Sequence, residues 1–117
     1  MALLTEALKR FTYRMAFAGG WRSATLSGTE TLTKKSSQFQ VLDANGADRN
    51  VTLPTVSIDD DGYFFLIANS AAAAKNLVVL DAAAATIGTV NQSEAGLFYV
   101  DSSGSWQLFG IFTFAAS

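Results

Sequence analysis

The fold is decided by the stretch Phe39-Gln-Val-Leu-Asp-Ala-Asn-Gly-Ala-Asp-Arg-Asn-Val-Thr-Leu53. Apolar residues alternate with polar ones on both sides of Asn45-Gly46, and a period of two places them on one face of a strand. Asn-Gly favours a tight reverse turn, because both residues tolerate positive φ. We therefore predict a β-hairpin with one apolar face. A lone hairpin is marginally stable in water, so further strands must pack with it.

Short strand patterns continue along the rest of the chain. Polar or small-residue turns separate them, for example Asp101-Ser-Ser-Gly104. About eight short strands joined by turns predict a single all-β domain, either a β-sandwich or a jelly-roll-like fold. The strands expected beyond the hairpin lie at residues 29–33, 62–69, 76–81, 86–90, 97–100 and 106–114.

Two of these strands, at residues 62–69 and 106–114, are apolar on both faces. Such a strand is buried on both sides, so a second sheet or a partner must cover each face. We expect the faces turned away from the core to form an interface with another copy or another protein. Its residues in these two strands would be Phe64, Leu66, Phe109 and Ile111.

Residues 1–25 have a different pattern and are expected to form an arm that docks on a neighbouring molecule, ahead of a β domain at residues 26–117. Apolar residues recur at three- and four-residue spacing, which is typical of a short amphipathic helix. An extended arm is the alternative, because several aromatic residues there also alternate. The arm residues expected to make contacts are Leu4, Leu8, Arg10, Phe11, Arg14, Phe17 and Trp21.

Charge is unevenly distributed along the chain, although the net charge is only −2. The basic residues dominate up to Thr25, and the acidic residues dominate after it. A basic segment ahead of an acidic body favours docking onto an acidic surface, which a neighbouring copy would supply. Solvated charge without a particular role is the alternative.

Composition excludes most catalytic chemistry. The chain contains no His and no Cys, which removes the commonest general base and all thiolate chemistry. The acidic residues lie at expected turns, where carboxylates are common. Asp59-Asp60-Asp61 lacks the alternating spacing of a calcium-binding loop, so it is interpreted as a solvated turn. We therefore expect no enzyme activity, no metal site and no cofactor.

Nucleic acid and membranes are not expected as direct partners. An acidic balance disfavours nucleic-acid binding, which requires a basic patch interleaved with aromatic residues. No apolar run approaches the roughly 20 residues that span a bilayer. The amphipathic segment at the start of the chain is short and only modestly basic, so we expect it to pack on protein rather than on lipid.

Three segments resemble the small β modules of tailed-bacteriophage virions, and most closely capsid decoration (cement) proteins. The segments are Phe39–Pro54, Gly62–Asn69 and Gly104–Phe109. The resemblance lies in the general character and the order of these segments rather than in an invariant motif. It covers roughly residues 29–109. It implies an oligomer, with a trimer favoured, that binds the exterior of the head and clamps major capsid proteins together. The protein would be made in the host cytoplasm, and the family offers no catalytic residues.

Two other functions are consistent with the same sequence. A tail or fibre module would bind another tail protein or a receptor. A carbohydrate-binding domain would require a solvent-facing tryptophan, either Trp21 or Trp106, as a platform for a sugar ring.

Overall fold

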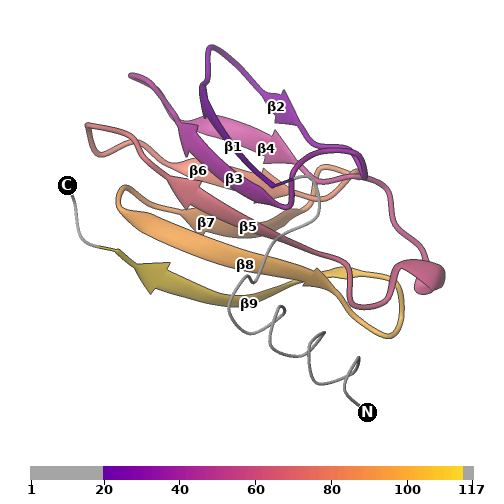
Figure 1. The fold of residues 1–117 in the computed structure, drawn as a ribbon. Helices are drawn as coiled ribbons and strands as arrows, with labels where there is room; N and C mark the ends of the chain where they lie inside the picture. The colour runs from indigo at the N-terminus through magenta and orange to yellow at the C-terminus, as the bar shows by residue number, and fades with distance from the viewer. Residues whose placement is uncertain (1–19, 115–117) are drawn as a thin grey trace, which may run out of the picture.

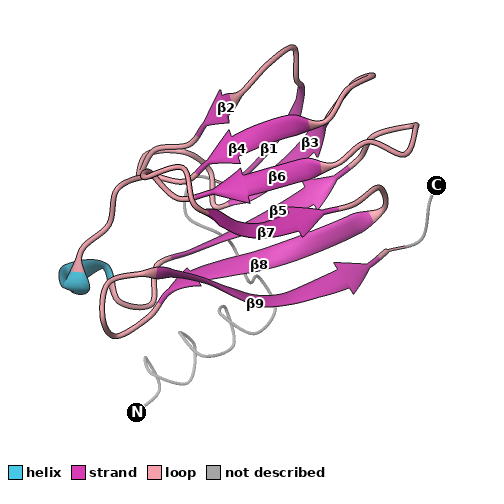
Figure 2. Ribbon diagram, turned by 180° about the vertical axis from the view of Figure 1, so that it is seen from behind, coloured by secondary structure: helices cyan, strands magenta, loops and turns pink. Residues whose placement is uncertain are grey.

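The computed structural model describes residues 20–114, and this part of the chain folds into nine β-strands in two sheets. One sheet has the strand order β1-β3-β5-β8-β9, and the other has the order β2-β4-β6-β7. Figure 1 shows the two layers, with β1 and β9 at opposite edges of the five-stranded sheet, and Figure 2 shows them from behind. The predicted all-β sandwich is confirmed.

The elements have the following bounds. The strands are β1 (Trp21–Thr25), β2 (Glu30–Thr31), β3 (Phe39–Asp43), β4 (Arg49–Thr52), β5 (Phe64–Asn69), β6 (Leu77–Leu80), β7 (Thr86–Val90), β8 (Glu94–Val100) and β9 (Trp106–Thr113). A short 3-10 helix, η1 (Ile58–Asp60), lies between β4 and β5.

The first six strands form a coil that alternates between the sheets. The odd strands enter the five-stranded sheet and the even strands enter the four-stranded sheet. Within each sheet, successive strands of this coil pair in parallel. The intervening strand of the opposite sheet provides the crossover that parallel pairing requires. The remaining three pairings are antiparallel. This topology is a coiled sandwich rather than the antiparallel Greek keys of a jelly roll.

The hairpin predicted at Asn45-Gly46 does not form. β3 pairs with β1 and β5, whereas β4 pairs with β2 and β6. The expected turn chemistry is present, since Asn45 has φ 57° and Gly46 has φ 83°. The side chain of Arg49 also donates hydrogen bonds to two carbonyls of this loop. The loop nevertheless forms an arch between the sheets, because an arch buries Leu42 and Val51 on both sides of one core.

The five-stranded sheet begins earlier than the boundary predicted at residue 25. Residues Trp21–Thr25 form β1 and pair with β3 in five consecutive positions, from Trp21 with Phe39 to Thr25 with Asp43. β8 also begins at Glu94, three residues before the strand expected at residues 97–100. The predicted arm residues before Gly20 lie outside the described residues.

The core fills the space between the sheets and draws on both of them. Its fully buried side chains include Leu42, Val51, Phe65, Ile67, Leu77, Val79, Val90 and Phe98. Trp106 closes one end, where its indole Nε1 donates a 2.9 Å hydrogen bond to the carbonyl of Pro54. Because this ring is 5% exposed, Trp106 is a core anchor and not the solvent-facing platform that a sugar requires.

A buried amide at the end of β5 organises the loop that follows. Asn69 is fully buried, and its Nδ2 donates to the carbonyls of Lys75 at 2.7 Å and Val90 at 3.0 Å. Its Oδ1 accepts from the backbone N–H of Ala71. Leaving such buried groups without partners would cost about 1–3 kcal/mol each. The side chain therefore stabilises the alanine-rich loop without any helical turn.

The turn between β8 and β9 packs tightly against η1. Gly104 has φ 82°, and a Cβ built at this position would lie 2.5 Å from the backbone nitrogen of Ile58. Asp101 holds the turn through hydrogen bonds that its Oδ1 accepts from the backbone N–H groups of Ser103 and Ser105. Gly104 is thus required both for its left-handed backbone conformation and for the absence of a side chain.

We predict that Gly104→Ala destabilises the protein more than Gly46→Ala does. Both glycines have positive φ, which costs an L-residue about 1–2 kcal/mol. A Cβ at Gly46 meets nothing within 4 Å, whereas at Gly104 it meets backbone atoms. Urea unfolding should therefore give a clearly larger loss of unfolding free energy for Gly104→Ala. Equal losses would contradict the close packing of the turn on η1.

Candidate interaction face

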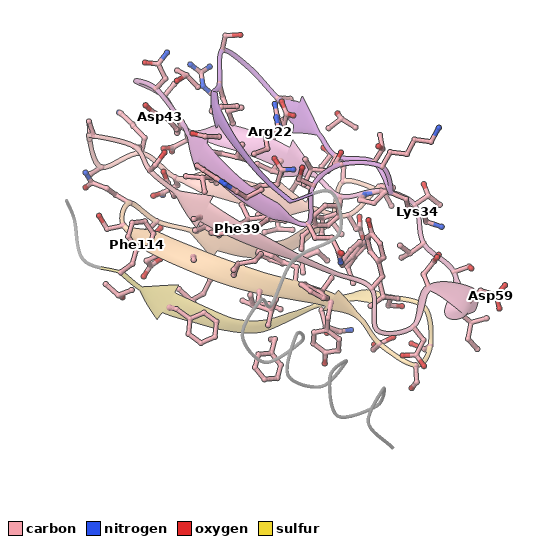
Figure 3. All side chains as sticks on the ribbon, viewed as in Figure 1. Arg22, Lys34, Phe39, Asp43, Asp59 and Phe114 are labelled. Carbon is pink, nitrogen blue, oxygen red and sulfur yellow. The ribbon has the colours of Figure 1, made fainter. Side chains whose placement is uncertain are left out.

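An apolar surface extends across all five strands of the larger sheet, on the side away from the four-stranded sheet. We call this side the outer face. Over residues 64–67 of β5 and residues 95–100 of β8, half-buried positions on the outer face alternate with buried positions. The side chains of the outer face include Trp21, Phe39, Val41, Phe64, Leu66, Leu97, Tyr99, Phe109 and Phe112. Figure 3 shows Phe39 over the middle of this sheet and Phe114 just beyond the end of β9.

The two edges of the outer face carry its most exposed aromatic rings. Trp21 on β1 is 64% exposed, and on β9 Phe109 is 68% and Phe112 is 50% exposed. Trp21 lies beside Phe39, with ring centroids 6.4 Å apart. Phe109 packs edge-on against Tyr99 at 6.2 Å. Large exposed apolar patches on a small protein mark interaction sites, because water solvates them poorly.

The opposite surface, on the outside of the four-stranded sheet, has a different character. Thr and Asn side chains there alternate with two half-buried aliphatic residues and no aromatic ring. These residues are Asn50, Thr52, Val78, Leu80, Thr86 and Thr89. A sheet face of this mixed composition can remain in water. The two sides of the sandwich are therefore not equivalent as docking surfaces.

A β-bulge in β9 changes which predicted residues reach the outer face. Phe98 pairs with Leu108 and Leu97 pairs with Gly110, so Phe109 is an extra residue on β9. Beyond the bulge the alternation is inverted, as expected for one inserted residue. Ile111 consequently packs against the core. Its prediction as an interface residue on the same face as Phe109 is wrong, because strict alternation cannot anticipate a bulge.

The other predicted contact residues divide into two groups. Trp21, Phe64 and Leu66 lie together with Phe109 on the outer face, on β1, β5 and β9. Leu4, Leu8, Arg10, Phe11, Arg14 and Phe17 lie outside the described residues.

Arg22, which the sequence grouped with the basic arm, belongs to a polar cluster inside the domain. Its Nη1 donates to Oε1 of Glu30 at 2.6 Å and to Oε1 of Gln40 at 2.9 Å. Gln40 is fully buried, and its Nε2 donates to the carbonyl of Ser37 at 2.6 Å. The cluster links β1, β2 and β3 where the coil begins. Arg22 therefore stabilises the fold of the domain rather than contacting a docking partner. Only the parallel pairing of β1 brings these residues together.

The acidic turn at Asp59-Asp60-Asp61 is part of a capping arrangement. The carboxylate of Asp60 accepts a 2.8 Å hydrogen bond from the backbone N–H of Ser57 and forms a 2.8 Å ion pair with Lys34. The hydrogen bond from Lys34, followed by that from Ser57, lowers the pKa of Asp60 below its ordinary value. Asp59 points away from the sheets at the tip of η1 (Figure 3).

Two further shifts in pKa reflect local structure. The hydroxyl of Ser103 and then the backbone N–H of Ser105 lower the pKa of Asp101, whose carboxylate holds the β8–β9 turn. Burial raises the pKa of Tyr63, whose hydroxyl donates to the carbonyl of Lys34. Each of these groups has a structural partner.

The described residues 20–114 also form surface grooves. An open groove of about 730 Å³ lies beside β2 and β4, and its lining is mostly threonine, lysine and aliphatic residues. Across the same range, no group of three or more His, Cys, Asp or Glu residues is placed to hold a metal ion. The described chain also has no helix with the length and apolar character needed to cross a membrane.

We predict that the carboxyl group of Asp60 titrates below the usual range of aspartate, and that Lys34→Met raises its pKa. A lowered pKa in the folded state stabilises the protein above the ordinary pKa of aspartate, and this contribution is lost as the pH falls through the lowered value. Carboxyl chemical shifts measured by NMR against pH would show the change. Lys35→Met is the matched control, and an equal effect from it would contradict the specific pair.

A scan against protein-family models matched no family, and searches of curated proteins and of solved structures found no match.

Proposed function

We propose that this chain is a structural virion protein of a tailed phage. In this proposal it is a capsid decoration protein that binds the exterior of the head as a homotrimer. It stabilises the contacts between major capsid proteins mechanically, without catalysis. The observation that carries the proposal is the aromatic outer face of the five-stranded sheet.

The size of the apolar contribution favours a docking role. Complete burial of a Phe, Leu or Val side chain is worth about 1.5–3 kcal/mol. Trp21, Phe109 and Phe112 are all at least half exposed on one face, so a partner that covers them gains several such contributions. Small contacts repeated around a symmetric shell also add through avidity. Such contacts raise the free energy needed to separate the subunits that they join.

The segments that resemble virion modules are those that build the sandwich. Phe39–Pro54 forms β3, the arch and β4, while Gly62–Asn69 includes the central strand β5. Gly104–Phe109 supplies the tight turn on η1 and the first half of β9 up to the bulge. The resemblance therefore applies to the scaffold that presents the outer face, and this supports the assignment to virion proteins.

One observation retains a second candidate, the carbohydrate-binding domain. Trp21 is exposed on a sheet edge beside Phe39, and an aromatic pair of this kind can stack on a sugar ring. Aromatic side chains at both edges of the sheet, however, favour a broad protein contact over a single sugar platform. A tail or fibre module would use the same face against another tail protein.

The copy number of the chain in purified virus particles tests the proposal. Quantitative mass spectrometry should find it in a number comparable with the major shell protein. A handful of copies would instead place the chain in the tail. Its absence from particles would contradict both virion functions and favour the carbohydrate-binding domain.

We also predict that Phe109→Asp weakens binding to shells purified without this chain. Loss of one buried aromatic ring should lower the affinity by roughly ten- to a hundredfold, since about 1.4 kcal/mol corresponds to tenfold. Thr89→Asp is the matched control, because Thr89 is an exposed strand residue on the other sheet. Sedimentation of shells with bound protein would measure both. An equal loss for the two variants would contradict docking through the outer face.

A further inference from the structure

The arch between β3 and β4, residues 44–48, contains a site of covalent modification. We propose that Asn45 converts spontaneously to aspartate and isoaspartate through a succinimide, and that Arg49 sets the rate of this reaction. The reaction needs no partner and no residue of the outer face, so its test does not depend on the proposed function.

The reaction joins the main chain of one residue to the side chain of the residue before it. The backbone nitrogen of Gly46 loses its proton and attacks Cγ of Asn45. A bond forms between these two atoms, the bond from Cγ to Nδ2 breaks, and the side-chain nitrogen takes up a proton and leaves as ammonia. Water then opens the five-membered ring at either of its two carbonyls, which gives aspartate or isoaspartate. Because ammonia departs, the amide is not regained.

The arch exposes the reacting groups and leaves the attacking nitrogen without a partner. Asn45 and Gly46 are both exposed, and Gly46 has no side chain to hinder the attack. They lie between the end of β3 at Asp43 and the start of β4 at Arg49, outside both strand ladders. The nitrogen of Gly46 donates no hydrogen bond to any atom of residues 20–114. It can therefore move towards Cγ without disturbing either sheet.

Hydrogen bonds distinguish this site from two related ones in the same chain. Asp61-Gly62 has the sequence to form the same ring, but the nitrogen of Gly62 donates a 2.9 Å hydrogen bond to the carbonyl of Val100. Asn69 is fully buried, and its Nδ2 donates to two carbonyls. Neither site can close the ring while these hydrogen bonds hold. Asn45 is therefore expected to react first.

Arg49 restrains the rotation that ring closure requires. A φ of 57° places Asn45 in the left-handed region, where its carbonyl oxygen lies close to its own Cβ. The nitrogen of Gly46 is consequently turned away from the side chain that it must attack, and the peptide has to rotate about the Cα–C bond. Nη2 of Arg49 donates a 3.0 Å hydrogen bond to this carbonyl oxygen. Rotation breaks that bond, so the guanidinium slows the reaction.

Peptide mapping of the full-length protein after incubation at neutral pH tests the proposal. Liquid chromatography with mass spectrometry separates the asparagine, aspartate and isoaspartate forms of the peptide that contains residue 45. We expect both products to accumulate there before isoaspartate appears at position 61 or 69, and to carry oxygen from ¹⁸O-labelled water. Isoaspartate is the diagnostic product, because direct hydrolysis of the side-chain amide gives aspartate alone.

Arg49→Met should accelerate the reaction at position 45 roughly tenfold, which corresponds to about 1.4 kcal/mol of barrier. Lys75→Met is the matched control, because it also replaces a cation with methionine. Lys75 precedes Asn76, whose carbonyl accepts from the backbone N–H of Arg49, but no hydrogen bond joins its side chain to residues 44–48. Isoaspartate at Asp61 reports general opening of the domain and should not increase in either variant.

Several outcomes would overturn the proposal. One is the absence of isoaspartate at position 45 during the time in which a synthetic peptide of residues 39–53 converts. Earlier modification at position 61 or 69 would contradict the selection of Asn45. An unchanged or slower reaction in Arg49→Met would remove the restraint assigned to Arg49. Equal acceleration at position 61 would attribute the effect to unfolding instead of to the arch.

Discussion

A five-stranded sheet with apolar side chains on both faces needs a packing partner on each side, and the four-stranded sheet packs against only one of them. The inner face is satisfied by a packed core in which Phe65 and Phe98 are fully buried. The outer face retains the aromatic rings of Trp21, Phe109 and Phe112. This imbalance distinguishes the two sides of the sandwich, since the outside of the four-stranded sheet is rich in Thr and Asn. Because of this difference, the outer face is the side of the sandwich that offers apolar contacts to a partner.

The coiled path of the chain explains how so short a sequence builds such a face. Because successive strands alternate between the two sheets, each full turn of the coil adds one strand to each sheet. The antiparallel strands β8 and β9 then widen only the five-stranded sheet. Arg22, Glu30 and Gln40 hold the first coil together, while Asn69 organises the loop after β5. In the proposed function a neighbouring chain covers the outer face after assembly.

Most strand positions and the two-sided character of β5 followed from the sequence, because alternation is a local property. Strand pairing did not follow from the sequence. The Asn45-Gly46 turn fits an arch between two sheets as well as a hairpin within one sheet, and which of them forms depends on how the side chains of the two strands are buried in the core. The bulge at Phe109 is likewise set by pairing with β8, so Ile111 was placed on the wrong face. The edge strand at Trp21–Thr25 was missed because its partner lies 18 positions along the chain, at Phe39. Long-range contacts, rather than local propensity, decided each of these differences.

A cryo-EM reconstruction of virus particles that carry this chain would test the central claim, that the outer face is the docking surface. We predict that the side of the five-stranded sheet carrying Phe109 and Phe112 contacts a neighbouring chain, while the Thr-rich side of the four-stranded sheet faces solvent. The reverse orientation, with the four-stranded sheet against the shell and both phenylalanines away from any neighbouring chain, would contradict it.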